Sequence, residues 1–234
     1  MKKVPQAEAQ PELTPKAQET RQRIFDTAVR LFMEKGYEET TMRDIAAAAG
    51  CSLGLTYRYF ASKEDLVLAL YRQLSVDTKA RIAELPPAPL GERFQLIMTD
   101  ILERVTPYRA AWSGIFGGAM NPDSPIAVLG ARTADIRHEM RGVFTEMIAT
   151  ASDAPKKPDQ IAALGMLLYV AHLMTLLFWI SDRTPGCSAT HNLLDFSKDM
   201  LGLIKTVLFL PVASKGMARL AGIVESVFDG NADK

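Results

Sequence analysis

Residues 41–63 of this 234-residue chain read TMRDIAAAAGCSLGLTYRYFASK, and the order of helix signals in them decides the fold. Thr41 is a good helix N-cap residue, and Asp44 follows three positions later, which is the spacing of a capping box. The alanines that follow are strong helix formers with little bulk. Gly50 can take the left-handed conformation that ends a helix. The stretch therefore predicts a short helix over 42–49 that ends in a tight turn.

Two further helix starts follow the glycine turn. Ser52 is the N-cap residue of a helix predicted over 53–60. Ser62 begins a third helix, predicted over 62–84, with Asp65 as its capping-box partner. Two short helices joined by a glycine turn and followed at once by a third form the pattern of a helix-turn-helix unit.

The second helix of the unit carries side chains that suit nucleic acid. Tyr57 and Tyr59 flank Arg58, and Lys63 follows at the start of the next helix. Phenol hydroxyls and cationic groups contact phosphates and base edges. The alternative is that the tyrosines are partly buried and that Lys63 is a solvated surface charge, but their position after the turn favours DNA. The candidate DNA-binding residues are Thr41, Arg43, Ser52, Leu53, Leu55, Thr56, Tyr57, Arg58, Tyr59 and Lys63.

The stretch GYEETTMRDIAAAAGCSLGLTYRYFASKEDL resembles the DNA-binding segment of the tetracycline-repressor (TetR) family. The resemblance covers residues 21–74, about a quarter of the chain. The motifs that carry it are Gly36-Tyr37, Thr40-Thr41, Ile45-Ala46, Ala49-Gly50, Ser52, Tyr57-Arg58-Tyr59-Phe60 and Ser62-Lys63-Glu64. It implies a DNA-binding head on a helical body that dimerises and holds a small-molecule pocket.

The resemblance also implies roles within the head. The family positions that match Tyr57, Tyr59 and Lys63 commonly touch the DNA backbone. Those that match Arg43, Leu53, Leu55 and Tyr57 lie toward the groove. Two positions depart from the family, which often has valine in place of Cys51 and a polar or basic residue in place of Leu53. Leucines in the groove favour contacts with thymine methyl groups, so the operator sequence cannot be borrowed from relatives.

Composition limits the class of protein. Lys plus Arg and Asp plus Glu each number 27, so the formal net charge is zero. A histone-like coat protein would be basic, whereas a sequence-specific DNA-binding protein needs only a local patch. The two cysteines, Cys51 and Cys187, make no disulfide framework, which fits a cytoplasmic protein. Residues 1–13 lack the apolar core of a signal peptide and are expected to form a disordered arm.

The remainder of the chain is predicted to be helical, so the fold class is all-α. A head and linker helix are expected over 14–85, and the prolines in 86–89 mark the boundary to a ligand-binding and dimerisation domain over 86–234. Apolar residues there recur at intervals of three and four, without strand signals. Helices are expected near 90–105, 107–119, 123–151, 158–182, 190–210 and 213–229.

One segment admits two interpretations. Residues 161–180, IAALGMLLYVAHLMTLLFWI, are long and apolar enough for a transmembrane helix. Gly165, His172 and Thr175 interrupt the run, and no basic flank orients it. We therefore expect a helix buried by its own domain and by a partner subunit, and no membrane. With the resemblance, this predicts a homodimer through helices near 158–182 and 190–210.

The body also offers candidates for a ligand pocket. Aromatic and Met residues recur along three of the predicted helices, with His and Tyr groups among them, which is the composition of ligand sites. The candidate ligand-binding residues are Phe94, Met98, Trp112, Phe116, Met120, Met166, Tyr169 and His172. The alternative for each is ordinary core packing. Asp135, His138 and Glu139 could suggest a metal, but the first two share a helix face without the third, so no metal or cofactor is expected.

Four hypotheses follow. The leading one is a homodimeric repressor that binds a palindromic double-stranded DNA operator and is released by a small, largely hydrophobic effector. The main alternative is a DNA-binding repressor without an effector. An enzyme is disfavoured because G-x-S-x-G, P-loop, G-x-G-x-x-G and H-E-x-x-H motifs are missing from the sequence. The fourth hypothesis, a membrane protein, is supported only by residues 161–180.

Overall fold

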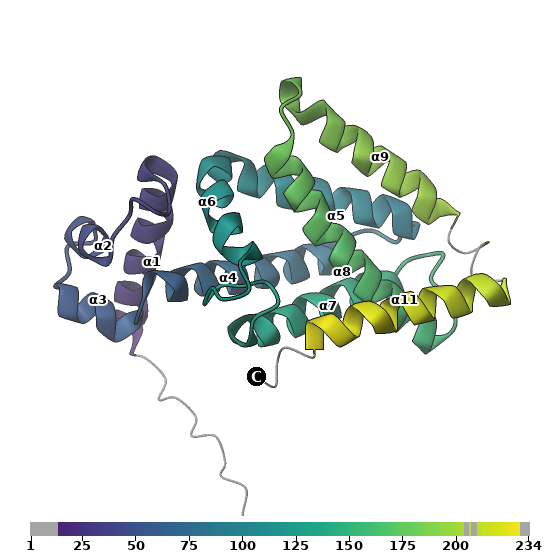
Figure 1. Cartoon of the computed structure of the whole chain (residues 1–234), viewed down its shortest axis with the longest axis horizontal. Coiled ribbons are helices and arrows are strands. Elements are labelled where there is room, and N and C mark those ends of the chain that lie inside the picture. The colour runs from purple at the N-terminus through teal and green to yellow at the C-terminus, as the bar shows by residue number, and fades with distance from the viewer. Residues whose placement is uncertain (1–13, 204–205, 207–209, 230–234) are drawn as a thin grey trace, which may run out of the picture.

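The computed structural model describes residues 14–203, 206 and 210–229, and every regular element in them is helical (Figure 1). The all-α prediction is thus confirmed for the described part of the chain. The arm expected at residues 1–13 lies outside the described residues. The helices are α1 (Pro15–Lys35), α2 (Met42–Ala48), α3 (Leu53–Tyr59), α4 (Lys63–Glu84), α5 (Leu90–Val105), α6 (Arg109–Met120), α7 (Ala134–Ala149), α8 (Pro158–Ser181), α9 (Ser188–Gly202) and α11 (Pro211–Asp229).

The local signals in residues 41–63 act as the sequence predicts. The Thr41 hydroxyl accepts from the Asp44 backbone N–H at 3.2 Å, and the Asp44 carboxylate accepts from the Thr41 N–H at 3.0 Å, which completes the capping box. These hydrogen bonds from Thr41 hold the pKa of Asp44 below its usual range. Gly50 has φ +63° in the turn between α2 and α3. Ser52 caps α3 by accepting from the Leu55 N–H at 3.2 Å.

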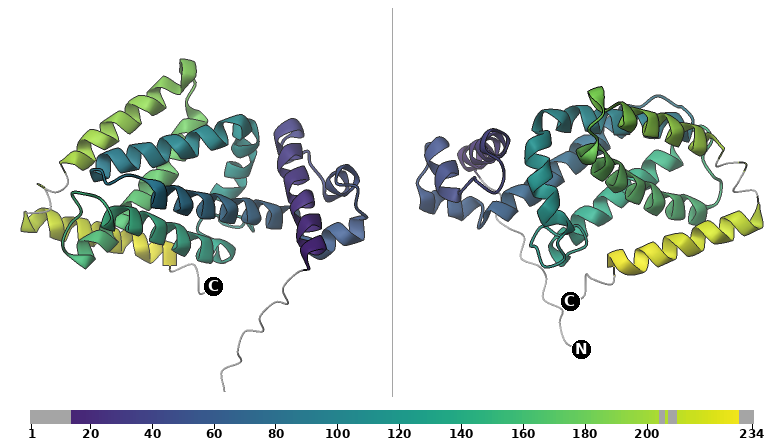
Figure 2. Two further views of the ribbon diagram at one scale, coloured as in Figure 1. Left: turned by 180° about the vertical axis from the view of Figure 1, so that it is seen from behind. Right: turned by 45° about the horizontal axis from the view of Figure 1, so that its top comes forward.

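The helices α1, α2 and α3 pack into a small unit at one end of the molecule, which we call the head (Figures 1 and 2). Its core contains the fully or almost fully buried side chains Ile24, Phe32, Ile45 and Phe60, with Leu66 from the first turns of α4. The small alanines of α2 let this helix lie close to α1 and α3. These side chains are the head part of one apolar cluster that continues into the body, and their packing fixes the exposed face of α3.

Helix α4 leaves the head and runs into the rest of the chain, where it packs against α7 (Figure 1). Two ion pairs join it to the segment before and at the start of α7: Arg72 with Asp135 at 2.9 Å, and Arg132 with Asp65. The second pair corrects one detail of the sequence analysis. Asp65 donates its N–H to the Ser62 cap, but its carboxylate pairs with Arg132 instead of completing a capping box.

The body comprises α5 to α11, and α8 is its central helix. Helix α7 and helix α11 both pack against α8, while α9 packs against α5. The aromatic core joins these layers, with Phe144 of α7 between Phe94 of α5 and Tyr169 of α8 at ring separations of 6.4 and 6.5 Å. Among the described residues α8 alone is long and apolar enough to cross a membrane, a test that the core helix of a globular protein also passes.

Three predicted helix limits in the body were wrong or incomplete. The helix expected over 123–151 begins only at Ala134, because residues 121–130 form turns and Ala131–Thr133 a short 3-10 helix; in the turns Asn121 Oδ1 accepts from the Asp123 N–H and Ser124 Oγ from the Ile126 N–H. Pro211 is the first residue of α11, where its missing N–H costs nothing. The helix expected over 190–210 is described as α9 up to Gly202, and part of the remainder lies outside the described residues.

Candidate functional site

The head lies at one end of the molecule (Figure 2), and several polar side chains of α2 and α3 are exposed there. Arg43 projects from α2, and Tyr57 and Arg58 project from α3, where 48% of Tyr57 is exposed. Thr41 and Ser52, the two cap residues, are also exposed at the helix N-termini. Exposed N-termini and cations on one short unit form a surface on which phosphate oxygens can be bound.

One candidate DNA-binding residue is corrected by the structure. Thr56 is completely buried beneath α3, and its hydroxyl donates to the Ser52 carbonyl at 3.1 Å. Helical geometry explains the error, because three residues in a row on a helix cannot all face outward. Tyr57 and Arg58 face solvent, and Thr56 packs inward. Thr56 therefore belongs to the head core and cannot touch DNA.

Lys63, which was predicted to contact DNA, makes contacts within the head. Its ammonium donates to the carbonyls of Tyr37 at 2.7 Å and Glu38 at 3.3 Å, and it lies 4.2 Å from the centre of the Tyr37 ring. It thereby ties the start of α4 to the turn after α1. The freely presented cations of this face are thus Arg43 and Arg58, and a phosphate contact by Lys63 stays a prediction.

The remaining candidates on α3 are partly buried. Leu53, Leu55 and Tyr59 are each of intermediate exposure, and Leu53 and Tyr59 also pack against the core of the head. Sequence reasoning missed Arg23 of α1, which donates from Nε to the Ala49 carbonyl at 3.1 Å and from Nη2 to the Cys51 sulfur at 3.6 Å. Arg23 so clamps the turn between the two helices. In the sequence, the only sign of this role is that Arg23 lies next to the apolar face of α1.

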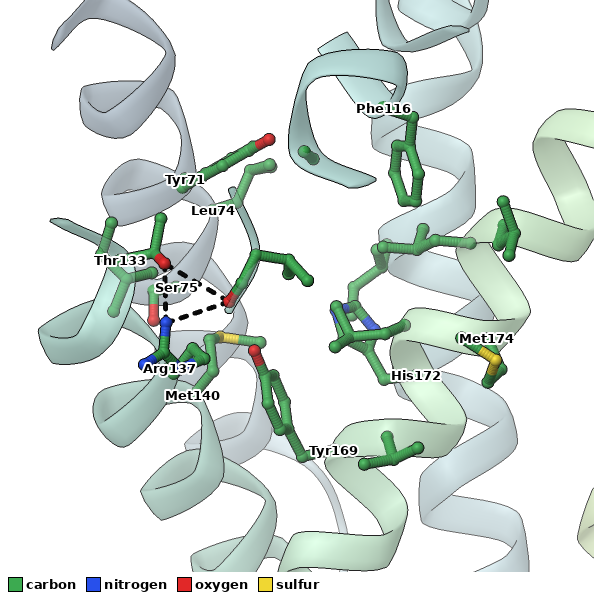
Figure 3. A pocket seen from close by; sticks show the side chains of 18 of the residues that line it. Tyr71, Leu74, Ser75, Phe116, Thr133, Arg137, Met140, Tyr169, His172 and Met174 are labelled. Carbon is green, nitrogen blue, oxygen red and sulfur yellow. Dashed lines mark hydrogen bonds between the residues drawn. The ribbon is translucent and has the colours of Figure 1, made fainter. Parts of the chain in front are cut away.

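A cavity of about 310 Å³ lies in the body and is lined almost wholly by apolar atoms (Figure 3). Five of the eight candidate ligand-binding residues line it: Trp112, Phe116 and Met120 from α6, and Tyr169 and His172 from α8. Val128 and Leu129, in the turn before α7, also line it. The volume and the apolar lining are those of a small-molecule site.

The other three candidates are not among the lining residues. Phe94 and Met98 are almost completely buried in the core between α5 and α7, and Met98 lies behind the cavity wall with its sulfur 3.4 Å from Nδ1 of His172. Met166 lines a separate cleft between α7, α8 and α11. The steps of three along α8 rotate slowly, so Met166 has already left the face that Tyr169 and His172 share.

Helix α4 supplies a wall that sequence reasoning missed. Tyr71, Leu74, Ser75 and Thr78 all line the cavity, and the Tyr71 ring stacks on Trp112 with centroids 6.0 Å apart and planes at 9°. In the sequence these residues show only the spacing of one helical face. The cavity thus lies directly against the helix that connects it to the head.

The polar groups of the cavity are neutral or already bonded. Burial lowers the pKa of His172 to about 4 and raises the pKa values of the Tyr71 and Tyr169 hydroxyls, so all three are uncharged at neutral pH. Arg137 donates to the carbonyls of Val128 at 3.0 Å, Gly130 at 2.6 Å and Phe228 at 2.9 Å, and to the Thr133 hydroxyl at 2.7 Å. Arg137 thereby fastens the turn before α7 and the end of α11 around the cavity.

No cluster of three or more His, Cys, Asp or Glu side chains with the geometry of a metal site occurs in the part of the chain that the structure describes. Asp135, which the sequence placed near His138, pairs with Arg72 instead.

The chain resembles known proteins of one family. Residues 24–70 match the family model described as bacterial regulatory proteins, tetR family. The chain is 38% identical over 197 residues to the HTH-type transcriptional regulator TtgR of Pseudomonas putida, a match that covers 80% of this chain and 93% of TtgR.

The chain belongs to the TetR family of transcriptional regulators. A second relative of this TetR-family protein is the HTH-type transcriptional repressor KstR of Rhodococcus jostii, which is 29% identical over 179 residues, covering 75% of this chain and 79% of KstR. Among solved structures, FadR of Thermus thermophilus in complex with lauroyl-CoA has a TM-score of 0.59 at 22% identity, covering 78% of this chain and 94% of that one. The likeness to FadR shows the TetR-family fold.

Proposed function

We propose that this TetR-family regulator is a homodimeric repressor that binds a palindromic DNA operator through its two heads and leaves it when a small, hydrophobic effector enters the cavity of the body. The observation that carries the proposal is the position of α4. Leu74 and Ser75 of this helix line the cavity, while Leu66 belongs to the core of the head. A ligand that alters the packing of α4 in the cavity therefore alters the placement of the head.

A dimer is supported by apolar side chains that lie in the open on the helices where the sequence predicts the interface. Met174 and Phe178 of α8 are 50% and 43% exposed, and Phe196, Met200 and Leu203 at α9 are 45% to 60% exposed. Large exposed apolar side chains on these helices favour a protein interface. Two heads held about 34–36 Å apart would meet successive major grooves of one duplex face.

The effector half of the proposal rests on the cavity and on the fold. FadR, which shares the fold, is a TetR-family repressor whose structure holds lauroyl-CoA. In this chain the cavity offers apolar walls and few polar groups, which suits a hydrophobic effector. Release needs only that the effector prefers the conformation in which the heads do not fit the operator. The relatives TtgR and KstR are regulators, so we infer a cytoplasmic regulator and not an enzyme.

The first test is selection of bound sequences from a random pool of duplex DNA with the purified protein. We expect a palindrome with half-sites about one helical turn apart, and a complex that contains an even number of subunits by sedimentation. Arg43→Ala and Arg58→Ala each remove one cation from each of the two heads, so each should weaken binding and reduce the slope of log affinity against log salt by about two. A selected sequence without two-fold symmetry would refute the homodimer, and the main alternative, a repressor without effector, predicts that no ligand changes affinity.

A further inference from the structure

We infer that the effector is an electrically neutral aromatic molecule whose hydroxyl, or equivalent hydrogen-bonding group, pairs with the Ser75 side chain on α4. This inference rests on the proposed effector function of the cavity and specifies the chemistry that the cavity selects. Three features of the described residues carry it: the ring-lined walls, an unpartnered hydroxyl, and the absence of an available charge.

The walls favour flat rings. Tyr71 and Trp112 are stacked nearly parallel, with planes at 9°, across the junction of α4 and α6. Tyr169 faces the cavity from α8 and meets the Phe228 ring edge-on with centroids 5.8 Å apart (Figure 3). Phe116 adds a further ring from α6. Aromatic rings placed on several sides of a cavity reward a planar guest, because stacked and edge-to-face contacts add to the burial of apolar surface.

Ser75 is the unsatisfied group in this wall. Its side chain is completely buried, it lines the cavity, and its hydroxyl has no hydrogen-bond partner among the described residues. A buried hydroxyl without a partner is costly, and such groups are rare in folded proteins. Elsewhere in this chain buried threonines bond to carbonyls, as Thr56 and Thr175 do at 3.1 and 2.8 Å. The Ser75 hydroxyl is therefore left for a guest that supplies the missing partner.

The described lining of the cavity has no charged group available to pair with a charged ligand, so the cavity favours a neutral one. Among the lining residues that the structure describes, none is acidic, and Arg137 is the one permanent charge. The Arg137 guanidinium is engaged by three carbonyls and the Thr133 hydroxyl. A carboxylate would have to displace these contacts, and an ammonium would find no counter-ion. Burying an uncompensated ion costs several kcal/mol, so both should be rejected.

A matched series of probes tests the chemical class. Biphenyl, para-phenylphenol, para-phenylbenzoate and para-phenylbenzylamine share a flat body and differ in one group. Calorimetric titration of the full chain at pH 7 should show para-phenylphenol as the tightest of the four, with the benzoate and the benzylamine each weaker by at least roughly tenfold. Equal or tighter binding of either charged probe, or no binding of para-phenylphenol up to its solubility limit, would overturn the inference.

Ser75→Ala tests the anchor. The variant should bind para-phenylphenol roughly tenfold more weakly and biphenyl as tightly as before, because only the phenol uses the hydroxyl. Without ligand, its urea midpoint should stay the same or rise, since an unsatisfied hydroxyl has been removed. Ser113→Ala, at an exposed serine of α6 that does not line the cavity, should change neither property. An equal loss for both probes, or a lowered midpoint, would assign Ser75 a structural role and refute the pairing.

Operator release is measured separately, so that the two proposals fail differently. Fluorescence anisotropy of the selected operator is recorded with and without para-phenylphenol. Selective binding of the phenol with no release would leave the chemistry of the cavity intact and refute its role as the effector site. Release by the benzoate but not by the phenol would uphold the proposed function and overturn the chemical class inferred for its ligand.

Discussion

Acid should destabilise this protein through His172, a single buried imidazole in α8. Only 7% of the residue is exposed, its Nδ1 lies 3.4 Å from the Met98 sulfur, and the Phe144 ring centre is 5.3 Å away. Tyr169, whose ring centre lies 6.4 Å from that of His172, is also neutral at pH 7, since burial raises its pKa. With no partner for its charged form, burial lowers the pKa of His172 to about 4.

The size of the effect follows from the two pKa values. In the unfolded chain a histidine has a pKa of about 6.5, so between about pH 6.5 and pH 4 the unfolded state takes up a proton that the folded state does not. The stabilisation by the neutral folded form is therefore complete above about pH 6.5 and is lost as pH falls toward 4. At pH 5 the loss relative to pH 7.5 amounts to about 2 kcal/mol of unfolding free energy.

Urea unfolding at pH 7.5 and at pH 5 measures this loss when wild type is compared with His172→Gln at one protein concentration. The carboxylates contribute equally to both proteins, so the difference between their pH-dependences isolates His172. We expect wild type to lose about 2 kcal/mol more than the variant on acidification. His138→Gln, at an exposed position of α7, serves as the control and should behave as wild type. If wild type and His172→Gln lose the same stability, the imidazole is charged or solvated in the fold and the reasoning fails.

Three further outcomes are expected. Thr41→Ala removes the α2 cap and should lower the free energy of unfolding by about 1 kcal/mol in urea titrations, and an unchanged midpoint would contradict the cap. Gly91→Ala places a methyl group on the backbone carbonyl of Lys198 and should cost more than about 2 kcal/mol, whereas Gly142→Ala, which faces open space in a helix, should be neutral or stabilising by up to about 1 kcal/mol. Tyr57→Phe should weaken operator binding roughly threefold in anisotropy titrations with unchanged thermal stability, and full retention of affinity would remove the hydroxyl from the interface.

The head was predictable because its signals are local. The side chain of an N-cap residue accepts a hydrogen bond from the N–H three residues later. The starts of α2, α3 and α4 could therefore be located from Thr41, Ser52 and Ser62 alone. The roles of side chains on those helices depend on tertiary contacts, which is why Thr56 was placed on the wrong face. Lys63 illustrates the same limit, since its two carbonyl partners lie in a turn about 25 residues earlier in the chain.

The turn region before α7 was mispredicted although its signals are present in the sequence. Asn121-Pro122 and Ser124-Pro125 are turn dipeptides, and the apolar residues Ile126, Val128 and Leu129 lie between them and Gly130, in the stretch predicted as helix from residue 123. In the structure Ile126 packs against Gly118 of α6, and the backbone of this turn faces the cavity and Arg137. The buried residues of such a turn are apolar, as are the residues on the buried face of a helix. Their composition alone therefore does not distinguish a buried turn from a helix.

Helix α4, on which the proposed regulation depends, was located correctly although it has no single apolar face. On a helix, residues advance by about 100° each, so a helix buried on one side alternates buried and exposed positions. In α4 the consecutive residues Leu66, Val67 and Leu68 are all buried, which requires neighbours on more than one side. Farther along, the buried positions are Ser75, Thr78 and Ile82, and the two polar residues among them line the cavity. A helix that packs against both the head and the body has no single apolar face. The sequence also does not distinguish a serine that lines a cavity from a serine that is exposed to solvent. The weak amphipathic pattern of α4 therefore follows from its two sets of neighbours, one in the head and one in the body.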